Sequence, residues 1–220
     1  MKSILFVVAH PDDVAGCAGG TAILLRKKYA LHVACATKGE RGCPDRWSMA
    51  KTAAIREKEE AAACRMLGAS LTFLGQIDAE VFASREACEQ LAGIIRKLRP
   101  AAVFTLWPID AHPDHAAVSI MARKAMKLAG SKAELVFFEA YFRSQASQFD
   151  PDMYVDITSV IERKMALVRC HRCQNVRGRL EKGMREQNSF RGGQAGVPYA
   201  EGFKTVRPWR NTSKSVLASL

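Results

Sequence analysis

The sequence of 220 residues lacks any apolar run close to the roughly 20 residues that a membrane-spanning helix requires. Its N-terminal apolar stretch, residues 4–9, is too short for the core of a signal peptide and leads directly into a charged segment. From these absences we expect neither a membrane-spanning protein nor one with a standard export signal. We therefore expect a cytoplasmic protein with no membrane partner.

A second cysteine pair to match Cys170-His-Arg-Cys173 is also missing. Structural zinc sites of the C-x-x-C type usually need two such pairs, so this motif alone does not predict one. The seven cysteines are odd in number, and most lie inside apolar segments. This usage indicates free, buried thiols in a reducing compartment rather than a disulfide framework.

The glycine cluster at residues 16–20 lacks the G-x-G-x-x-G spacing of a dinucleotide-binding loop. No acidic residue ends the second expected strand, as that fingerprint also requires. We therefore expect no dinucleotide cofactor. The glycines are better explained by close packing of the backbone, which a side chain would prevent.

The net charge of +11 is unevenly distributed, because 13 of the 33 Lys and Arg but only 4 of the 22 Asp and Glu lie in residues 160–220. Aromatic residues are not interleaved with these cations as they are in nucleic-acid modules, so no nucleic-acid partner is expected. A solvated basic surface is the preferred interpretation. The alternative is that the arginine-rich segment 163–191 neutralises a phosphate or carboxylate on a substrate.

Short apolar runs alternate with amphipathic segments through the first 140 residues. The runs that predict buried strands are 3–9, 31–37, 71–74, 101–107 and 135–140. The segments with helical spacing are 21–30, 50–67, 84–98 and 114–129. This alternation predicts an α/β protein, a three-layer Rossmann-like fold with a mostly parallel sheet. We expect one catalytic domain over residues 1–206 and a loose tail over residues 207–220.

Two clusters of histidine and aspartate follow expected strands. The first is His10-Pro-Asp-Asp13, and the second is His112-Pro-Asp-His115. Ligand sites of parallel sheets lie outside the carboxyl ends of the strands, so the clusters are expected to meet. Two histidines and a carboxylate around an open position are a common catalytic zinc site, in which the pKa of water falls from about 16 to roughly 7.

Further motifs accompany these clusters over residues 3–205. The motifs are Gly19-Gly-Thr21, Thr37-Lys-Gly-Glu40, the helix from Arg56 to Gly68, Val155-Asp-Ile-Thr158, His171-Arg-Cys-Gln174 and Tyr199-Ala-Glu-Gly-Phe203. Together with the two clusters, they resemble the PIG-L/LmbE-like family of zinc-dependent N-acetylglucosaminyl deacetylases. The resemblance implies that His10, Asp13 and His115 bind the metal, which is expected to be Zn²⁺ with Fe²⁺ as the alternative.

The resemblance also implies roles for the neighbouring polar residues. Asp12 would act as the general base, and His112 would stabilise the oxyanion that forms as the amide carbonyl becomes tetrahedral. Asp114 would orient and charge His112, in the way that carboxylates support histidines elsewhere. Arg56 and Asp78 resemble the positions that contact the sugar.

The reaction implied by the resemblance is removal of the N-acetyl group from a small molecule that contains N-acetylglucosamine. Family members act on this sugar linked to inositol, phosphatidylinositol, malate or another sugar, and the sequence does not choose among them. Two alternatives remain open, a zinc amidase acting on thiol conjugates and a catalytically inactive sugar-binding protein on the same scaffold. The sequence also leaves open whether the protein forms a homo-oligomer.

Two positions depart from the family pattern. Val14 stands where a glutamate often follows the second aspartate, and Cys173 stands where a serine is usual. Because the implied metal ligands include neither position, we expect activity to survive. The first change is expected to affect the surroundings of the metal, and the second the substrate contacts near the C-terminal helix.

Overall fold

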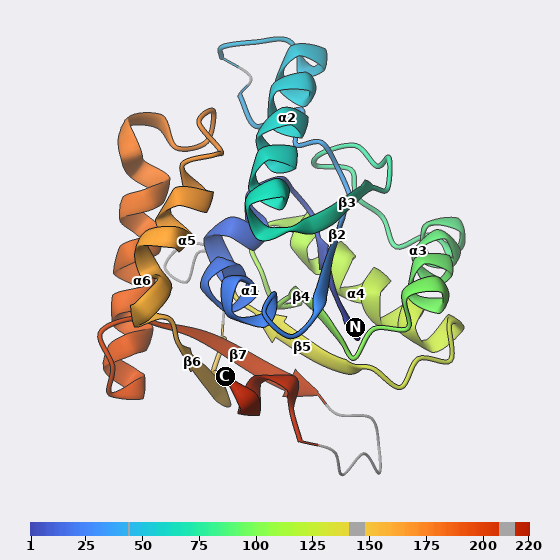
Figure 1. Ribbon diagram of the computed structural model, residues 1–220. Coiled ribbons are helices and arrows are strands. Elements are labelled where there is room, and N and C mark those ends of the chain that lie inside the picture. Colours follow the sequence, from blue (N-terminus) through green and yellow to red (C-terminus); the bar gives the residue numbers. More distant parts are fainter. Residues whose placement is uncertain (44, 141–147, 207–213) are drawn as a thin grey trace.

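The computed structural model describes residues 1–43, 45–140, 148–206 and 214–220. One seven-stranded sheet runs through the molecule in the order β3-β2-β1-β4-β5-β7-β6 (Figure 1). The strands are β1 (Ser3–Val8), β2 (Ala30–Cys35), β3 (Ala69–Phe73), β4 (Ala102–Leu106), β5 (Glu134–Phe138), β6 (Met153–Asp156) and β7 (Ala200–Val206). The first five strands are parallel to one another, which confirms the predicted α/β fold with a mostly parallel sheet.

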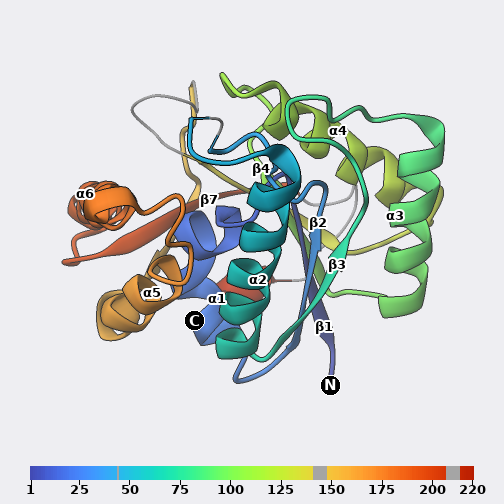
Figure 2. The ribbon, with the colours of Figure 1, turned by 90° about the horizontal axis from the view of Figure 1, so that it is seen from above.

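Helices cover both faces of the sheet and make three layers (Figure 2). One face carries α1 (Gly19–Leu25), α2 (Met49–Leu67), α5 (Ile161–Val168) and α6 (Arg179–Ala195), and the other carries α3 (Arg85–Leu98) and α4 (Pro113–Leu128). Serine side chains cap two of the helices, since Ser48 accepts from the Lys51 amide and Ser84 from the Ala87 amide. Helix α1 ends at Leu25, five residues before its predicted end.

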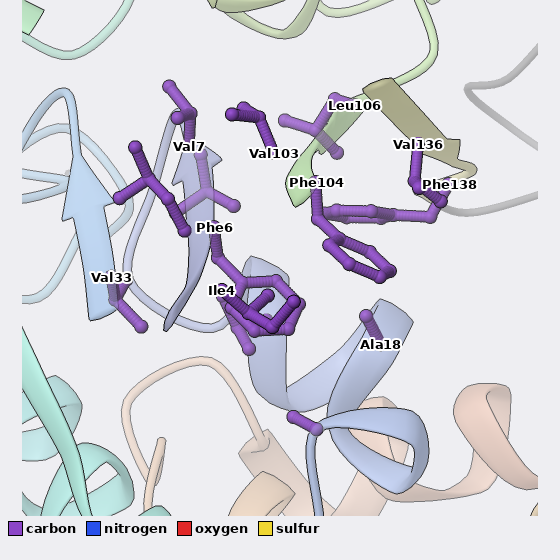
Figure 3. Packing of buried hydrophobic residues seen from close by; sticks show 14 of the residues in the cluster. Ile4, Phe6, Val7, Ala18, Val33, Val103, Phe104, Leu106, Val136 and Phe138 are labelled. Carbon is purple, nitrogen blue, oxygen red and sulfur yellow. The ribbon is translucent and has the colours of Figure 1, made fainter. Parts of the chain in front are cut away.

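The core lies on both faces of the sheet, against α1 and α5 on one side and α3 and α4 on the other, and Figure 3 shows the part around β1, β4 and β5. All six residues of β1 are buried. Phe6 of β1 lies against Phe104 of β4 with their ring centroids 4.9 Å apart, and Phe203 of β7 reaches the same ring at 5.8 Å. Each such phenylalanine stabilises the fold by about 1.5–3 kcal/mol through the apolar surface that it removes from water.

The antiparallel edge of the sheet was not predicted from the sequence. Strand β7 pairs antiparallel with both β5 and β6, so it joins the C-terminal segment to the parallel strands. Tyr199-Ala-Glu-Gly-Phe203, one of the family-like motifs, enters this strand, and Glu201 accepts hydrogen bonds from the amides of Gly20 and Thr21 at 2.8 and 2.7 Å. The motif therefore links the start of α1 to the antiparallel strand β7 through hydrogen bonds.

The C-terminal segment differs in part from the predicted loose tail. Residues 207–213 lie outside the described part of the chain, but residues 214–220 are described. Leu217 is buried in the core, and the Val216 amide donates to the Glu134 carboxylate at 2.9 Å. Val216 also packs against this core, so residues 214–220 are held against the protein, and the boundary at residue 206 stays a prediction.

The chain order of the strands creates a site at one edge of the sheet. β1 lies between β2 and β4, and the chain reverses its direction of travel across the sheet at this point. In doubly wound sheets, the loops that leave such neighbouring strands separate and leave a crevice. The loops after β1 and β4 carry the two histidine clusters, so the topology brings them together.

No helix in the described ranges is long and apolar enough to cross a bilayer. The cytoplasmic location stays a prediction.

Candidate active site

Three acceptor side chains converge on one point at the ends of β1 and β4. His10 Nδ1 lies 3.2 Å from His115 Nε2, and the Asp13 carboxylate lies 4.0 Å from the first nitrogen and 3.6 Å from the second. Four-coordinate zinc with bonds of about 2.0–2.1 Å separates its ligand atoms by about 3.4 Å. The spacing of His10, Asp13 and His115 therefore fits the coordination shell of one small divalent cation.

Carboxylates behind the histidines determine which ring nitrogens carry protons. His10 Nε2 lies 3.1 Å from Asp114 and 3.2 Å from Asp78, while His115 Nδ1 lies 3.1 Å from Asp110. A ring nitrogen that faces a carboxylate carries its hydrogen there, so the other nitrogen presents a lone pair. Both lone pairs then point at the space between the rings. A cation placed in that space would be bound by both rings.

The charges around His10 lead to the same conclusion. Burial lowers the pKa of His10, but its hydrogen bonds to Asp114 and Asp78 and the charge of Asp13 outweigh burial and raise the pKa to about 10. Asp114, Asp78 and Asp13 therefore stabilise a positive charge at His10. Asp13 itself is held by the amides of Ala9 and His10, which donate to its Oδ2 at 3.0 and 2.9 Å.

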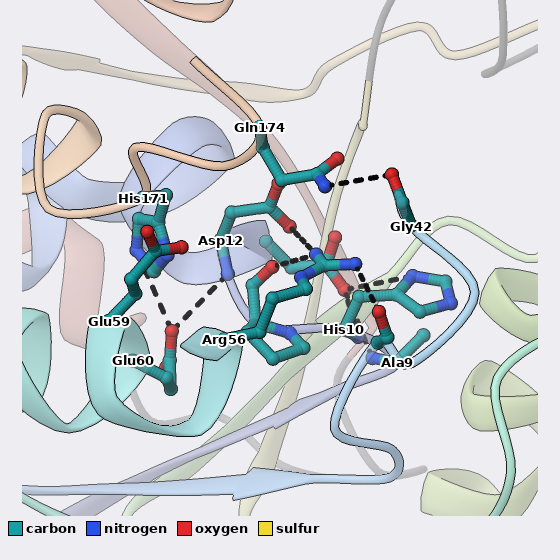
Figure 4. Close-up of polar contacts among 12 residues, drawn as sticks. Ala9, His10, Asp12, Gly42, Arg56, Glu59, Glu60, His171 and Gln174 are labelled. Atoms are coloured by element: carbon teal, nitrogen blue, oxygen red, sulfur yellow. Dashed lines mark hydrogen bonds and ion pairs between the residues drawn. The ribbon is translucent and has the colours of Figure 1, made fainter. Parts of the chain in front are cut away.

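Asp12 lies beside this group in an unusual backbone conformation. Its φ is +100°, a region that side chains other than glycine rarely adopt. Its amide donates to the Glu60 carboxylate at 3.2 Å, and its own carboxylate lies 3.3 Å from an Arg56 nitrogen (Figure 4). Burial raises the pKa of Asp12 to about 6, although the Arg56 charge opposes the shift. A carboxyl group with such a pKa can take and return a proton near neutral pH.

Arg56 is buried and joins the loop after β1 to the loop after β2. Its guanidinium donates to the carbonyls of Gly39 and Pro11 at 3.0 and 2.6 Å. A Cβ on Gly39 or Gly42 would overlap this guanidinium, and Gly39 also has a φ of +63°. Gly39 and Gly42, in the loop after β2, are thus required because the Arg56 guanidinium packs directly against their backbone.

Asp114 occupies a different position from the one predicted. Its carboxylate lies on His10 Nε2 and accepts from the amides of Ala79 and Val81 at 2.7 and 3.2 Å. Asp114 and His112 are instead joined through the backbone, because the Asp114 amide donates a hydrogen bond to His112 Nδ1 at 3.3 Å. The expected orientation of His112 by the Asp114 carboxylate is therefore corrected to an orientation by its backbone.

The other nitrogen of His112, Nε2, takes no part in this hydrogen bond. Since Nδ1 accepts a hydrogen bond, Nε2 carries the hydrogen of the neutral ring. Burial and the neighbouring His10 and His115 lower the pKa of His112, which favours the neutral ring. A neutral ring of this tautomer still offers a hydrogen-bond donor.

A cavity of about 430 Å³ opens over these groups. Its lining includes the predicted residues His10, Asp12, Asp13, Arg56, Asp78, His112 and His115. Asp114 is buried behind His10 and is not part of the lining. Asp78 does reach the cavity, but its two oxygens are engaged by His10 Nε2 and the Arg41 amide. The structure thus gives Asp78 a contact with a predicted metal ligand in addition to its place in the cavity.

The C-terminal motifs close one side of the cavity. Gln174 lines it and donates to the Gly42 carbonyl at 3.1 Å, across a gap of 132 residues in the chain (Figure 4). Cys173 is buried outside the cavity, where its thiol lies 3.0 Å from the Glu59 carboxylate as a serine hydroxyl would. Val14 is buried in the core. Both departures from the family pattern therefore lie outside the cavity lining.

Sequence reasoning did not single out several residues of the site, among them Asp110, Arg41 and Arg179. Asp110 supports His115, Arg41 holds Asp78 through its amide, and Arg179 lines the cavity from α6. Asp110 precedes the second cluster by two residues, so an acid in that loop was a usable signal. Arg179 lies in the arginine-rich segment 163–191, for which a substrate anion was one of two interpretations, but no local signal singles it out, because its place depends on how α6 packs.

Comparison with known proteins places the chain among enzymes. It is 30% identical to the 4-oxalmesaconate hydratase of Pseudomonas putida over 94% of this chain and 90% of that protein. It is also 30% identical to the diacetylchitobiose deacetylase of Thermococcus kodakarensis, over 94% of this chain and 84% of that protein. The structure of N,N'-diacetylchitobiose deacetylase from Pyrococcus horikoshii superposes with a TM-score of 0.84 at 29% identity, covering 94% of this chain and 84% of that one.

The model of one protein family matches more than half of the chain. It is described as PIG-L: GlcNAc-PI de-N-acetylase, and it matches residues 5–126, which include both histidine clusters. The chain therefore belongs to the PIG-L family.

Proposed function

We propose that this protein is a metal-dependent hydrolase that removes the acetyl group from the nitrogen of an N-acetylglucosamine-containing small molecule. One observation carries the proposal. The lone pairs of His10 and His115 and the Asp13 carboxylate converge on one point, and Asp12 lies beside them at the floor of an open cavity. Membership of the PIG-L family and two deacetylases among its relatives support the same activity.

Zn²⁺, or Fe²⁺ in its place, would be held by His10, Asp13 and His115, and when bound it would polarise the amide carbonyl and make water acidic. Asp12 would accept the proton of the attacking water and then deliver it to the departing amine nitrogen. His112 would donate a hydrogen bond from Nε2 to the carbonyl oxygen as negative charge develops there. Arg56 would hold Asp12 in position during both transfers, in addition to any contact with the sugar.

A second candidate function is the addition of water to an unsaturated carboxylic acid. It is favoured by the 30% identity to a hydratase, which extends over 90% of that protein. The same set of groups could serve both reactions, because each requires an acidic water and a base that takes its proton. The two candidates differ in product, since only the hydrolase releases acetate.

The metal content of the purified protein is the first test. We expect about one zinc or iron per chain in the wild type and a large loss of metal in the Asp13→Ala variant, because one ligand is gone. The metal-loaded wild type is then assayed for acetate release from diacetylchitobiose and N-acetylglucosaminyl L-malate, and for hydration of 4-oxalmesaconate.

Acetate release that depends on the metal would support the deacetylase. Hydration of 4-oxalmesaconate without acetate release would replace it by the second candidate. A wild-type protein that cannot be loaded with zinc or iron would contradict both.

A further inference from the structure

The carboxylates that line the cavity already have partners. Asp12 lies against Arg56, Asp13 accepts from two backbone amides, and Asp78 is shared between His10 and the Arg41 amide. These three carboxylates are thus committed to Arg56, to the proposed metal site and to His10. Any positive side chain of the lining without a partner is open to an incoming anion.

Arg179 is such a side chain. Three arginines line the cavity, and two of them have acidic partners, since Arg56 pairs with Asp12 and Arg41 with Glu80. Within the described ranges, Arg179 makes no side-chain hydrogen bond or ion pair, and it is exposed at the first position of α6. The N–H groups of its guanidinium therefore face solvent at the cavity wall.

The surroundings of Arg179 keep its charge uncompensated. Glu181, the acid in the first turn of α6, is already within 2.7 Å of Arg169 and 3.7 Å of Arg185. The exposed neighbours Arg177 and Lys182 have the same sign. The 17-residue helix α6 also begins here, and the positive end of its dipole adds to the potential.

We infer that Arg179 binds a carboxylate on the part of the substrate that extends beyond the acetamide group. This inference rests on the proposed function and names its substrate class, an N-acetylglucosamine conjugate with an anionic substituent. A single guanidinium matches one carboxylate through two parallel hydrogen bonds. The lining also includes Gln174 and Gly42, which are uncharged and do not compete with that ion pair.

The test compares an anionic with a neutral substrate. In zinc-loaded enzyme, Arg179→Gln should raise KM for N-acetylglucosaminyl L-malate about tenfold, which is the effect of losing about 1.4 kcal/mol of binding. The kcat for this substrate and the KM for diacetylchitobiose should change less than about twofold. Lys182→Gln is the matched control, because it removes one positive charge from an exposed position of α6 outside the cavity lining and should change neither KM.

Equal effects of Arg179→Gln on both substrates, or an effect no larger than that of Lys182→Gln, would overturn the inference. If the wild type hydrolyses neither conjugate, the deacetylase proposal fails separately. Calorimetry with L-malate on the zinc-loaded proteins then decides the anion site. Weaker binding in Arg179→Gln alone supports the site, and absent or unchanged binding refutes it.

Discussion

Asp12 combines a costly backbone conformation with a chemically useful side chain. A residue other than glycine at φ +100° costs on the order of 1–3 kcal/mol, and such strain persists only when the surroundings enforce it. Here the buried carboxylate of Glu60 holds the Asp12 amide and Arg56 holds its side chain. In the proposed reaction, this strain would turn Asp12 toward the attacking water while Asp13 faces the metal.

The side chain of Asp12 can be tested without changing its shape. Asp12→Asn should lower kcat by about 100-fold to 10,000-fold, because the amide cannot accept the proton of the attacking water. Asparagine tolerates positive φ comparatively well, so the thermal stability should remain close to that of the wild type. The variant should also retain its metal, measured by elemental analysis. Activity above a tenth of the wild-type value would exclude Asp12 as the base.

At the scale of elements, a buried ion pair ties the C-terminal edge of the sheet to the first helix. Lys164 of α5 lies 2.8 Å from Glu201 of β7, and both side chains are fully buried. Glu201 also accepts from the first amides of α1, and Lys164 donates to Asn188 of α6 at 2.6 Å. Four elements therefore meet at one satisfied polar network.

Removing one partner of this network should be costly. Glu201→Gln leaves the Lys164 charge buried without a counterion, and we expect the free energy of unfolding in urea to fall by about 3–5 kcal/mol. Replacing Lys164 by Met in the same variant should restore part of the loss. Glu162→Gln is the control, since that exposed acid pairs with Arg185 in solvent and should cause no measurable change. Similar losses for Glu162→Gln and Glu201→Gln would show that burial is not the cause.

At the scale of the molecule, bound metal should stabilise the whole fold. The ligands come from the loops after β1 and β4, so metal that binds only the native state opposes unfolding. Zinc at 100 times its Kd adds about 2.7 kcal/mol, which corresponds to about 5–10 °C in Tm for a chain of this size.

A chelator should therefore lower the Tm measured by calorimetry, and added zinc should restore it. The Asp13→Ala variant serves as the control, because its Tm should respond weakly to either treatment. An unchanged Tm in the wild type after proven removal of metal would contradict a site that links the two loops.

The sequence by itself determined the family, the alternation of strands and helices and six of the side chains around the proposed metal site. These features are local, since a buried parallel strand requires an apolar run and the site motifs are short segments at strand ends. The resemblance added His10, Asp13 and His115 as the ligand set, and the structure brings these three together.

Only the tertiary structure decided which carboxylate supports which histidine. Asp114 contacts His10 across 104 residues of chain, although His112 is nearer in sequence. It also decided that β6 and β7 close the sheet antiparallel and that Arg179 lines the cavity. Such contacts join segments far apart in the chain, and their geometry depends on how helices and strands pack. Local periodicity and motif spacing carry no information about that packing, so these partners emerge only from the folded molecule.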